Sequence, residues 1–336
     1  MKKIVIVTDG WKPQISGVVR SLEKTMEILK KNDFEVILIH PGLFRNFPVF
    51  FYPEVRLSVF AKKKIDKIIT KEKPDFVHIA TEGTLGLAAR MVCLHKKIKF
   101  TTAYHTHIPL YLKVRTGFLF NSTYAYLRWF HRTTQALMVS TQSLKDELEL
   151  HGFKKIVLCP LGVDTDFFKR DSGQKNEIEN YQSPVFVFCG RVAIEKNVKE
   201  FLDCDLPGTK LIIGDGPQRK ELEKEYGKKA VFVGYQKGED LVKLLSACDV
   251  FVFPSYTDTF GLVVLEALAC GVPVAAHNVM GPRDIITHGV DGFVGDDLTS
   301  AALACINLSR EKCREKALRF SWEESVKSFI TNLVQI

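Results

Sequence analysis

Short apolar runs alternate with longer amphipathic segments along the whole chain. In residues 17–31, for example, Val18, Leu22, Met26 and Leu29 recur on one face of a helix. Strands that alternate with helices are typical of parallel sheets with helices on their faces, so we expect an α/β fold. The expected strands are Lys3–Thr8, Glu35–His40, Phe76–Ala80, Lys99–Tyr104, Ala136–Ser140 and Ile156–Cys159, followed by Val185–Cys189, Lys210–Ile213, Ala230–Val233, Val250–Phe253, Val274–Ala276 and Gly292–Val294.

A polar stretch without periodicity separates the two series of strands, and 336 residues are enough for two domains. We expect a first domain over 1–168, a linker over 169–184 and a second domain over 185–315. Residues 316–336 are expected to form a helix that packs back toward the first domain. Ligands of such sheets bind at the carboxyl ends of the strands, so the expected site is a cleft between the domains.

The composition excludes several classes of protein. With 46% hydrophobic and 26% charged residues, the chain is neither disordered, collagenous nor a coiled coil. It has no run of 18 apolar residues, so no transmembrane helix is expected, and the run Ile4–Val7 is too short for a signal peptide. The eight cysteines form no C-x-x-C pair, which favours small buried hydrophobes in a reducing cytosol over disulfides or a zinc site.

Charge is distributed unevenly. Residues 1–165 contain 26 Lys and Arg against 14 Asp and Glu, whereas the remainder contains 21 against 25. A basic half attracts nucleic acid, anionic lipid or a phosphorylated ligand, although a lysine-rich surface is also common without any partner.

Three segments follow predicted strands and carry candidate chemistry. Gly17 opens a helix and lets backbone approach a ligand closely, but the loop is not G-x-G-x-x-G, which argues against a nicotinamide dinucleotide. Arg191 and Lys196 follow a strand end and could together neutralise a diphosphate, or could be solvated cations. In the block 254–266, a helix that begins near Gly261 would offer free amides to anionic oxygens.

Two acids and two histidines accompany these segments. Asp258 precedes the helix near Gly261, and Glu266 lies behind an apolar run, where a semi-buried carboxylate needs partners such as sugar hydroxyls; a helix cap and a surface glutamate are the alternative. His105 and His107 end a strand, but no acidic or cysteine cluster supports a metal site. His105 is expected to donate a hydrogen bond into the cleft, unless both rings simply pack against the loop.

Aromatic and basic residues interleave in 43–60 and 111–132. This pattern suits a membrane interface, stacked bases, or a core with a solvated face.

With these motifs in place, the chain resembles the GT-B glycosyltransferases of family 4, in particular the branch of sulfolipid synthases and diacylglycerol glycosyltransferases. The family's E-x7-E motif spans Asp258 to Glu266, with Asp in place of the first Glu. The resemblance covers essentially the whole chain. It also rests on Gly17-Val18-Val19-Arg20, His105-Thr106-His107, Gly190-Arg191, Glu195-Lys196, Gly214-Asp215-Gly216-Pro217, Gly234-Tyr235 and Gly281-Pro282-Arg283.

The resemblance implies two Rossmann-like domains and a role for each motif. Arg191 and Lys196 would hold the diphosphate and stabilise the leaving group, and His105 would support the donor sugar near the anomeric carbon. These three are the candidate catalytic residues, and no metal ion or cofactor is implied. The donor-binding residues would be Gly17, Asp258, Phe260, Gly261, Leu262, Glu266, Gly234 and Tyr235. The residues assigned to the acceptor or membrane side are Asp9, Trp11, Lys113, Arg115, Phe118, Phe120, Arg128 and Trp129.

The implied reaction is the α-retaining transfer of a hexosyl group from a nucleotide sugar to diacylglycerol, by a cytoplasmic protein bound peripherally to the anionic inner face of the cell membrane. UDP-glucose and UDP-glucuronate are the favoured donors, and GDP-mannose is a further candidate. A soluble saccharide or polyol acceptor is the first alternative, and a nucleotide-sugar epimerase is the second. Nucleic-acid binding is disfavoured, because the chain has no helix-turn-helix, zinc or RNP motif.

Overall fold

The computed structural model describes residues 1–14, 16–49, 52–116, 120–170 and 178–336. Contacts divide the chain into two compact units, Met1–Leu161 with Trp322–Ile336, and Gly162–Ser321. The first unit thus ends seven residues before the boundary expected at residue 168, and the segment from Trp322 onward is part of it.

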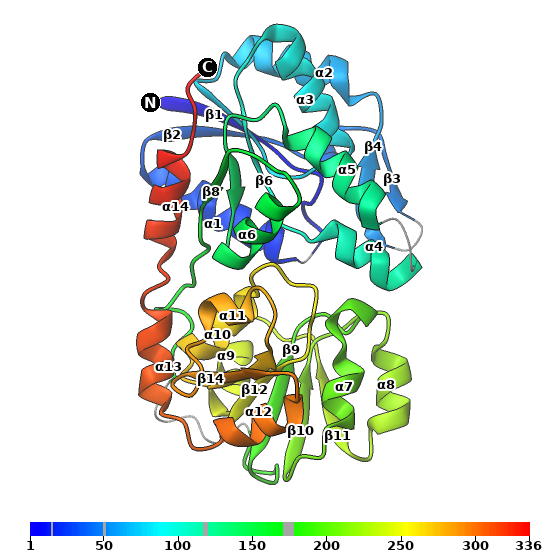
Figure 1. Ribbon diagram of the computed structural model, residues 1–336, viewed down its shortest axis with the longest axis vertical. Coiled ribbons are helices and arrows are strands. Elements are labelled where there is room, and N and C mark those ends of the chain that lie inside the picture. Colours follow the sequence, from blue (N-terminus) through cyan, green and yellow to red (C-terminus); the bar gives the residue numbers. More distant parts are fainter. Residues whose placement is uncertain (15, 50–51, 117–119, 171–177) are drawn as a thin grey trace. The chain divides into compact units, whose positions relative to one another are not determined.

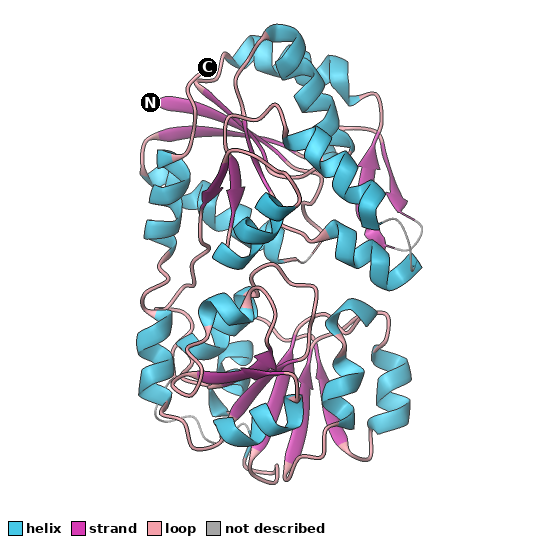
Figure 2. Cartoon of the chain, viewed as in Figure 1, coloured by secondary structure: helices cyan, strands magenta, loops and turns pink. Residues whose placement is uncertain are grey.

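The first unit is built on a parallel six-stranded sheet in the order β2-β1-β5-β6-β7-β8 (Figure 1). Its strands are β1 (Lys2–Val7), β2 (Phe34–Ile39), β5 (Phe76–Ile79), β6 (Thr101–Ala103), β7 (Leu137–Val139) and β8 (Ile156–Leu158). Strand residues on both faces are buried, as in Ile4–Val7, so both faces need covering helices (Figure 2). These are α1 (Gly17–Lys31), α2 (Ala61–Glu72), α3 (Thr84–Lys96), α4 (Ile108–Thr116), α5 (Phe120–His131), α6 (Gln142–Leu150) and α14 (Trp322–Thr331).

A two-stranded antiparallel hairpin, β3 (Asn46–Val49) and β4 (Tyr52–Ser58), lies outside this sheet. The sequence pattern does not predict this hairpin, because residues 43–60 show only interleaved aromatic and basic positions. Phe47 in β3 and Phe60 beyond β4 are both exposed, so the core interpretation does not hold for these two rings.

The second unit repeats the architecture with the strand order β11-β10-β9-β12-β13-β14, again all parallel. Its strands are β9 (Val185–Cys189), β10 (Thr209–Ile213), β11 (Ala230–Gly234), β12 (Val250–Phe253), β13 (Val274–His277) and β14 (Gly292–Gly295). Its helices are the 3-10 turn η3 (Ile194–Lys196), α7 (Val198–Asp203), α8 (Arg219–Tyr226), α9 (Gly238–Ala247), α10 (Leu262–Ala269), α11 (Pro282–Ile285), α12 (Leu298–Cys305) and α13 (Arg310–Ala317). All twelve predicted strands are therefore present, and the α/β fold with two Rossmann-like sheets is confirmed.

The C-terminal segment is two helices rather than one. Helix α13 belongs to the second unit, whereas α14 packs on α1 of the first. Both ends of the chain contact Asp75: the amide of Lys3 donates to its carboxylate at 2.7 Å, and the amide of Ile336 donates to its carbonyl at 3.0 Å. Among the described residues, no helix combines the length and the apolar character that crossing a membrane requires.

The eight cysteines are free thiols, and all but the half-buried Cys159 are buried. Burial raises the pKa of Cys93, Cys305 and Cys313 to about 12. The thiolate is the reactive form of cysteine, so these side chains behave as small core hydrophobes in the folded protein.

Candidate active site

The candidate site of the second unit lies where the strand order reverses, at the carboxyl ends of β9 and β12. Arg191 follows β9, and η3 ends at Lys196. Ser255 Oγ and Thr257 Oγ1, from the loop after β12, donate to the carbonyl of Glu195 at 3.2 and 3.1 Å. These bonds join the two loops, so the residues after β9 and β12 form one continuous edge.

Lys196 and Asp258 form an ion pair at this edge. Lys196 Nζ lies 2.5 and 2.8 Å from the two carboxylate oxygens, and the two side chains are 19% and 18% exposed. A pair with this little exposure is screened less than a surface pair, so it holds the ammonium group in place. The sequence assigned the two residues separately, to the diphosphate and to the sugar, and the structure brings them together.

Helix α10 begins beside this pair. Its N-cap, Gly261, has a φ of +87°, which is in the left-handed region that favours glycine, and no described side chain caps the helix. The amide of Val264 donates to the carbonyl of Gly261 at 2.9 Å, which leaves the amides of Leu262 and Val263 as the first-turn donors for an anion. The loop before the helix is held closely, because a Cβ at Gly281 would lie 2.7 Å from the carbonyl oxygen of Phe260. Glu266, one turn further on, is buried.

A close crossing of two loops fixes the backbone around Arg191. A Cβ at Gly214 would lie 1.8 Å from the carbonyl oxygen of Gly190, so only glycine fits there. The amide of Val192 donates to the carbonyl of Asp215 at 3.0 Å. The glycines of the Gly214–Pro217 motif are thus explained by backbone packing, which positions the arginine.

Gly234 and Tyr235 lie at the end of β11. Gly234 has a φ of +76°, and Tyr235 is 46% exposed. An exposed ring at a strand end is free to stack on a flat ligand, so a role beside the nucleotide base stays a prediction.

In the first unit, Gly17 is the first residue of α1, and Ser16 caps the helix by accepting from the amide of Val19 at 3.3 Å. Trp11 is half-buried, with its ring 6.1 Å from that of His40. Trp11 and Gly17 both lie in the segment after β1, as the sequence predicted.

The two histidines after β6 have different environments. His105 is half-buried; burial lowers its pKa, and the negative charge of Glu82 acts in the opposite direction. His107 is buried; its Nδ1 accepts from the amide of Leu110 at 3.1 Å, while Nε2 lies 2.7 Å from Glu147 Oε1. His107 therefore caps the start of α4 in the Nε2–H tautomer, which corresponds to the alternative of a ring packed against the loop.

Asp9 caps a different helix from a distance. Its carboxylate accepts from the amides of Leu85 and Gly86, at 2.7 and 3.3 Å, and from the hydroxyl of Thr81 at 2.8 Å. Burial raises its pKa against these hydrogen bonds. The structure thus gives Asp9 a supporting role at the start of α3, and contact with the acceptor stays a prediction.

Helices α4 and α5 carry the remaining acceptor-side residues. Lys113 Nζ lies 5.3 Å from the centre of the Phe120 ring, and Arg128 is exposed and donates to the carbonyl of His151 at 2.9 Å. Trp129 is 39% exposed, and the Arg90 guanidinium packs 4.1 Å from its ring centre. Phe118 and the side chain of Arg115 lie outside the described residues.

Comparisons with known proteins identify the family of the chain. Residues 15–167 match the model described as Glycosyltransferase Family 4, and residues 169–322 match Glycosyl transferases group 1. A sulfoquinovosyl transferase of Arabidopsis thaliana is 30% identical over 84% of this chain, which spans only 60% of that protein's length. The chain is a family 4 glycosyltransferase.

Other relatives of this glycosyltransferase act on different substrates. A GDP-mannose-dependent alpha-mannosyltransferase of Corynebacterium glutamicum is 27% identical, with 88% of this chain and 76% of that protein covered. The alpha-monoglucosyldiacylglycerol synthase of Streptococcus pneumoniae is 25% identical, with 90% and 78% covered. Anabaena HepE, solved with UDP-glucose, has the same fold, with a TM-score of 0.73, 16% identity, and 99% and 100% coverage. The HepE likeness concerns the fold alone, whereas the two family matches make this enzyme a hexosyltransferase that takes its sugar from a nucleotide sugar.

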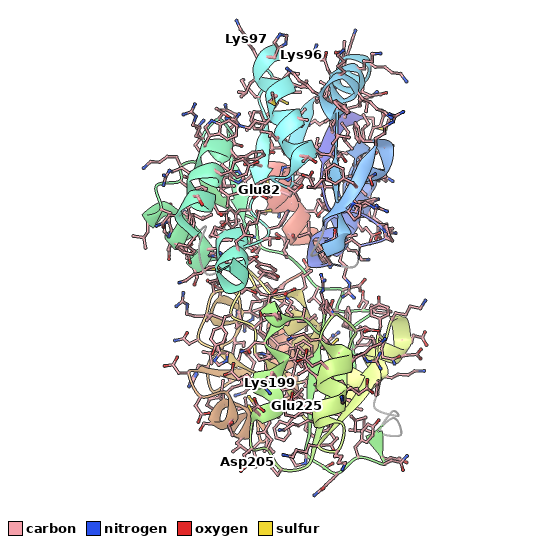
Figure 3. All side chains as sticks on the ribbon, turned by 90° about the vertical axis from the view of Figure 1, so that its right-hand side faces the viewer. Glu82, Lys96, Lys97, Lys199, Asp205 and Glu225 are labelled. Carbon is pink, nitrogen blue, oxygen red and sulfur yellow. The ribbon has the colours of Figure 1, made fainter. Side chains whose placement is uncertain are left out.

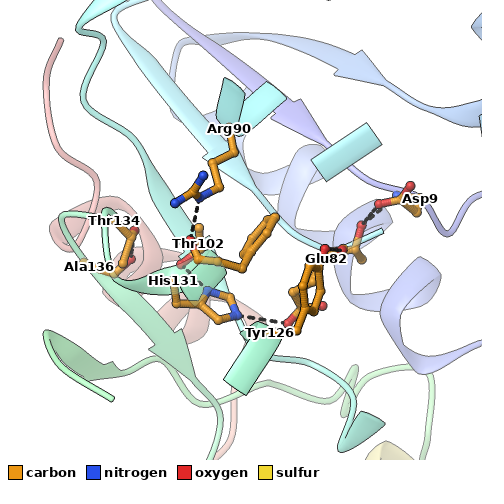
Figure 4. Close-up of polar contacts among 10 residues, drawn as sticks. Asp9, Glu82, Arg90, Thr102, Tyr126, His131, Thr134 and Ala136 are labelled. Carbon is orange, nitrogen blue, oxygen red and sulfur yellow. Dashed lines mark hydrogen bonds and ion pairs between the residues drawn. The ribbon is translucent and has the colours of Figure 1, made fainter. Parts of the chain in front are cut away.

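Sequence reasoning missed two polar groups of this hexosyltransferase. Glu82, after β5, lies 3.2 Å from His131 Nε2, and both residues are buried (Figure 4). In the second unit, Nε2 of His277, at the end of β13, lies 3.0 Å from Glu200 Oε1. The Tyr256 ring stacks on the His277 ring, with 4.1 Å between the ring centres. Glu82 lies three residues after the end of β5, and His277 is the last residue of β13. A position at or just after a strand end was the available signal.

Proposed function

We propose that this glycosyltransferase moves a hexosyl group, with retention of the α configuration, from a nucleotide diphosphate sugar to a lipid, and that the lipid is diacylglycerol. The observation that carries the donor part is the Lys196–Asp258 pair beside the uncapped start of α10. A cation, a carboxylate and helix amides thus lie together at the carboxyl edge of the second sheet, and these are the groups that a sugar diphosphate requires.

The chemistry follows from where charge develops. Negative charge accumulates on the departing diphosphate, so preorganised cations and amides at that position lower the barrier most. Arg191 and Lys196 would take the phosphate oxygens, and Asp258 and Glu266 would accept hydrogen bonds from sugar or ribose hydroxyls. His105, which burial keeps largely neutral near pH 7, would donate to the sugar near the anomeric carbon.

The lipid acceptor is supported by two independent observations. The relatives include a diacylglycerol-glucosylating enzyme, which covers 90% of this chain. Helices α4 and α5 also present cations next to aromatic rings, with Lys113, Arg128 and Trp129 on the surface, as is typical of helices at a membrane interface. The enzyme would then act as a peripheral protein on the inner face of the membrane.

The donor sugar is proposed to be glucose or glucuronate carried by UDP. GDP-mannose is the second candidate, because a mannosyltransferase that uses it covers 88% of this chain. The deciding experiment is a screen of UDP-glucose, UDP-glucuronate and GDP-mannose with purified protein and dioleoylglycerol in anionic vesicles, read by mass spectrometry of the lipid fraction. A hexosyl lipid from one donor is the expected product. Transfer only to saccharides or polyols, or donor conversion without an acceptor, would contradict the lipid proposal.

A further inference from the structure

Two buried carboxylates, Asp9 and Glu82, follow adjacent strands of the first sheet, β1 and β5 (Figure 4). Asp9 receives two backbone amides and a threonine hydroxyl at 3.3 Å or less. Among the described residues, Glu82 receives a single side-chain donor, His131 Nε2. A carboxylate has about four acceptor positions, and a buried one is costly unless they are filled. Asp9 is therefore satisfied by the fold, whereas the contacts within the described residues fill only part of the acceptor capacity of the Glu82 carboxylate.

The Glu82 carboxylate is nevertheless held firmly. With Nε2–H of His131 donating to Oε1, Nδ1 accepts from the Thr102 hydroxyl, 2.9 Å away on β6. Tyr126, on α5, donates its hydroxyl to the backbone carbonyl of Glu82 at 2.7 Å. The hydrogen bonds from His131 and Tyr126 thus fix the Glu82 carboxylate in one orientation. Recognition of a ligand hydroxyl requires a hydrogen-bond acceptor that is fixed in this way.

Glu82 also lies close to the chemistry proposed for this edge. It follows β5, and His105 follows the adjacent strand β6. Burial lowers the pKa of the His105 imidazole, and the negative charge of Glu82 opposes this shift. His105 is proposed to contact the donor sugar near the anomeric carbon, where the attacking oxygen of the acceptor must arrive. A fixed carboxylate after the adjacent strand is suited to receive the hydroxyl that carries this oxygen.

We infer that Glu82 accepts a hydrogen bond from the hydroxyl group of the acceptor and orients its oxygen for attack on the sugar. This inference rests on the proposed transferase function, but it does not depend on whether the acceptor is a lipid or a soluble molecule.

The test compares Glu82→Gln with the wild-type enzyme. Glutamine keeps the size and the contact with His131 but removes the charge that strengthens the hydrogen bond. Initial rates are measured with UDP-glucose and dioleoylglycerol vesicles, and UDP release is measured without acceptor. The expected result is a tenfold to hundredfold loss of kcat/KM for the acceptor. The donor KM and the acceptor-free release of UDP should stay within twofold of wild type.

Two further variants separate binding from folding. Glu225→Gln removes an exposed glutamate on α8 that pairs with Lys199 at 2.8 Å (Figure 3), and it should leave every parameter unchanged. Glu82→Asp keeps the charge and should recover part of the acceptor kcat/KM lost in Glu82→Gln. Equal losses of acceptor-dependent and acceptor-free activity, or an unchanged acceptor kcat/KM, would overturn the inference.

The lipid proposal can fail separately. If the wild type transfers nothing to dioleoylglycerol, glycerol and simple saccharides replace it as acceptors in the same assays. The Glu82→Gln loss is then expected with whichever of these acceptors the wild type uses, and wild-type kinetics with that acceptor would sink the inference.

Discussion

The carboxyl edges of the two sheets are built in different ways. In the second unit, the loops are hydrogen-bonded to each other, because the hydroxyls of Ser255 and Thr257 donate to the carbonyl of Glu195. Gly214 also lets two backbone segments cross in close contact. In the first unit, buried acids and histidines dominate, with Asp9 and Glu82 at strand ends. An edge made of backbone and small residues needs a specific sequence. An edge made of isolated side-chain pairs leaves little pattern in the sequence, which is why the first edge was harder to predict.

The first prediction tests the edge of the second unit. Lys196→Ala removes the cation that we place on the departing diphosphate, and turnover should fall about 100- to 1000-fold, the typical loss for one preorganised charge contact. The variant should stay folded, because the ion pair with Asp258 is partly exposed. The measurement is the steady-state rate with saturating donor, checked by thermal unfolding. A near-normal rate in this folded variant would remove Lys196 from the site.

The second prediction concerns the surface of the first unit. The double variant Lys113→Glu and Arg128→Glu should bind anionic vesicles at least tenfold more weakly, since each basic residue near such a surface contributes about 1 kcal/mol. Vesicle flotation measures the bound fraction. The matched control reverses the charges of Lys228 and Lys229, two exposed lysines of the second unit. If both double variants bind the vesicles equally, α4 and α5 are not the helices that contact the membrane.

The third prediction tests the contrast between Asp9 and Glu82. Asp9→Ala leaves the first amides of α3 without their acceptor, and the unfolding free energy of the first unit should fall by about 1–3 kcal/mol. All three tryptophans lie in that unit, so their fluorescence in urea reports it selectively. Glu82→Gln should cost less stability than Asp9→Ala, and the reverse order would undo the distinction drawn between the two acids.

The last prediction concerns a pH dependence of the first unit. Burial lowers the pKa of His78 from 6.5 to about 3. Below pH 6.5 the unfolded chain binds a proton that the folded chain does not, so stability falls as the pH drops toward 3, by up to about 1.4 kcal/mol per pH unit. His78→Asn should flatten this slope between pH 6.5 and 5, and His288→Asn, an exposed control, should not. An unchanged slope in His78→Asn would contradict the assignment.

The strands were predictable because a strand buried on both faces must be a continuous apolar run, as in Val185–Cys189. The β3–β4 hairpin could not be predicted in the same way, because Phe47 is exposed and the prolines at 48 and 53 interrupt the strand pattern. The helical C-terminus was predicted, but not its division at Leu318–Ser321 between the two units.

The candidate site was predictable as a set of residues but not as a set of contacts. Arg191, Lys196, Asp258 and Gly261 follow strand ends, which the alternation of strands and helices identifies. The ion pair between Lys196 and Asp258 joins residues 62 positions apart, and Glu82 meets His131 across 49. Pairings at such separations depend on strand order, which the hydrophobic pattern does not encode. His107 is a contact of short range: it caps the start of α4 through the amide of Leu110. In the sequence, a histidine with this capping role cannot be distinguished from one that binds a substrate or a metal.

The buried thiols have a practical consequence. Six of the eight cysteines belong to the second unit, and all six are buried. Burial raises the pKa of five of these thiols, Cys204, Cys248, Cys270, Cys305 and Cys313. An alkylating reagent can therefore modify them only after the surrounding structure opens. The rate of labelling, resolved peptide by peptide, would report how often each part of that unit opens without any added probe, and a bound nucleotide sugar would slow it where the ligand stabilises the fold.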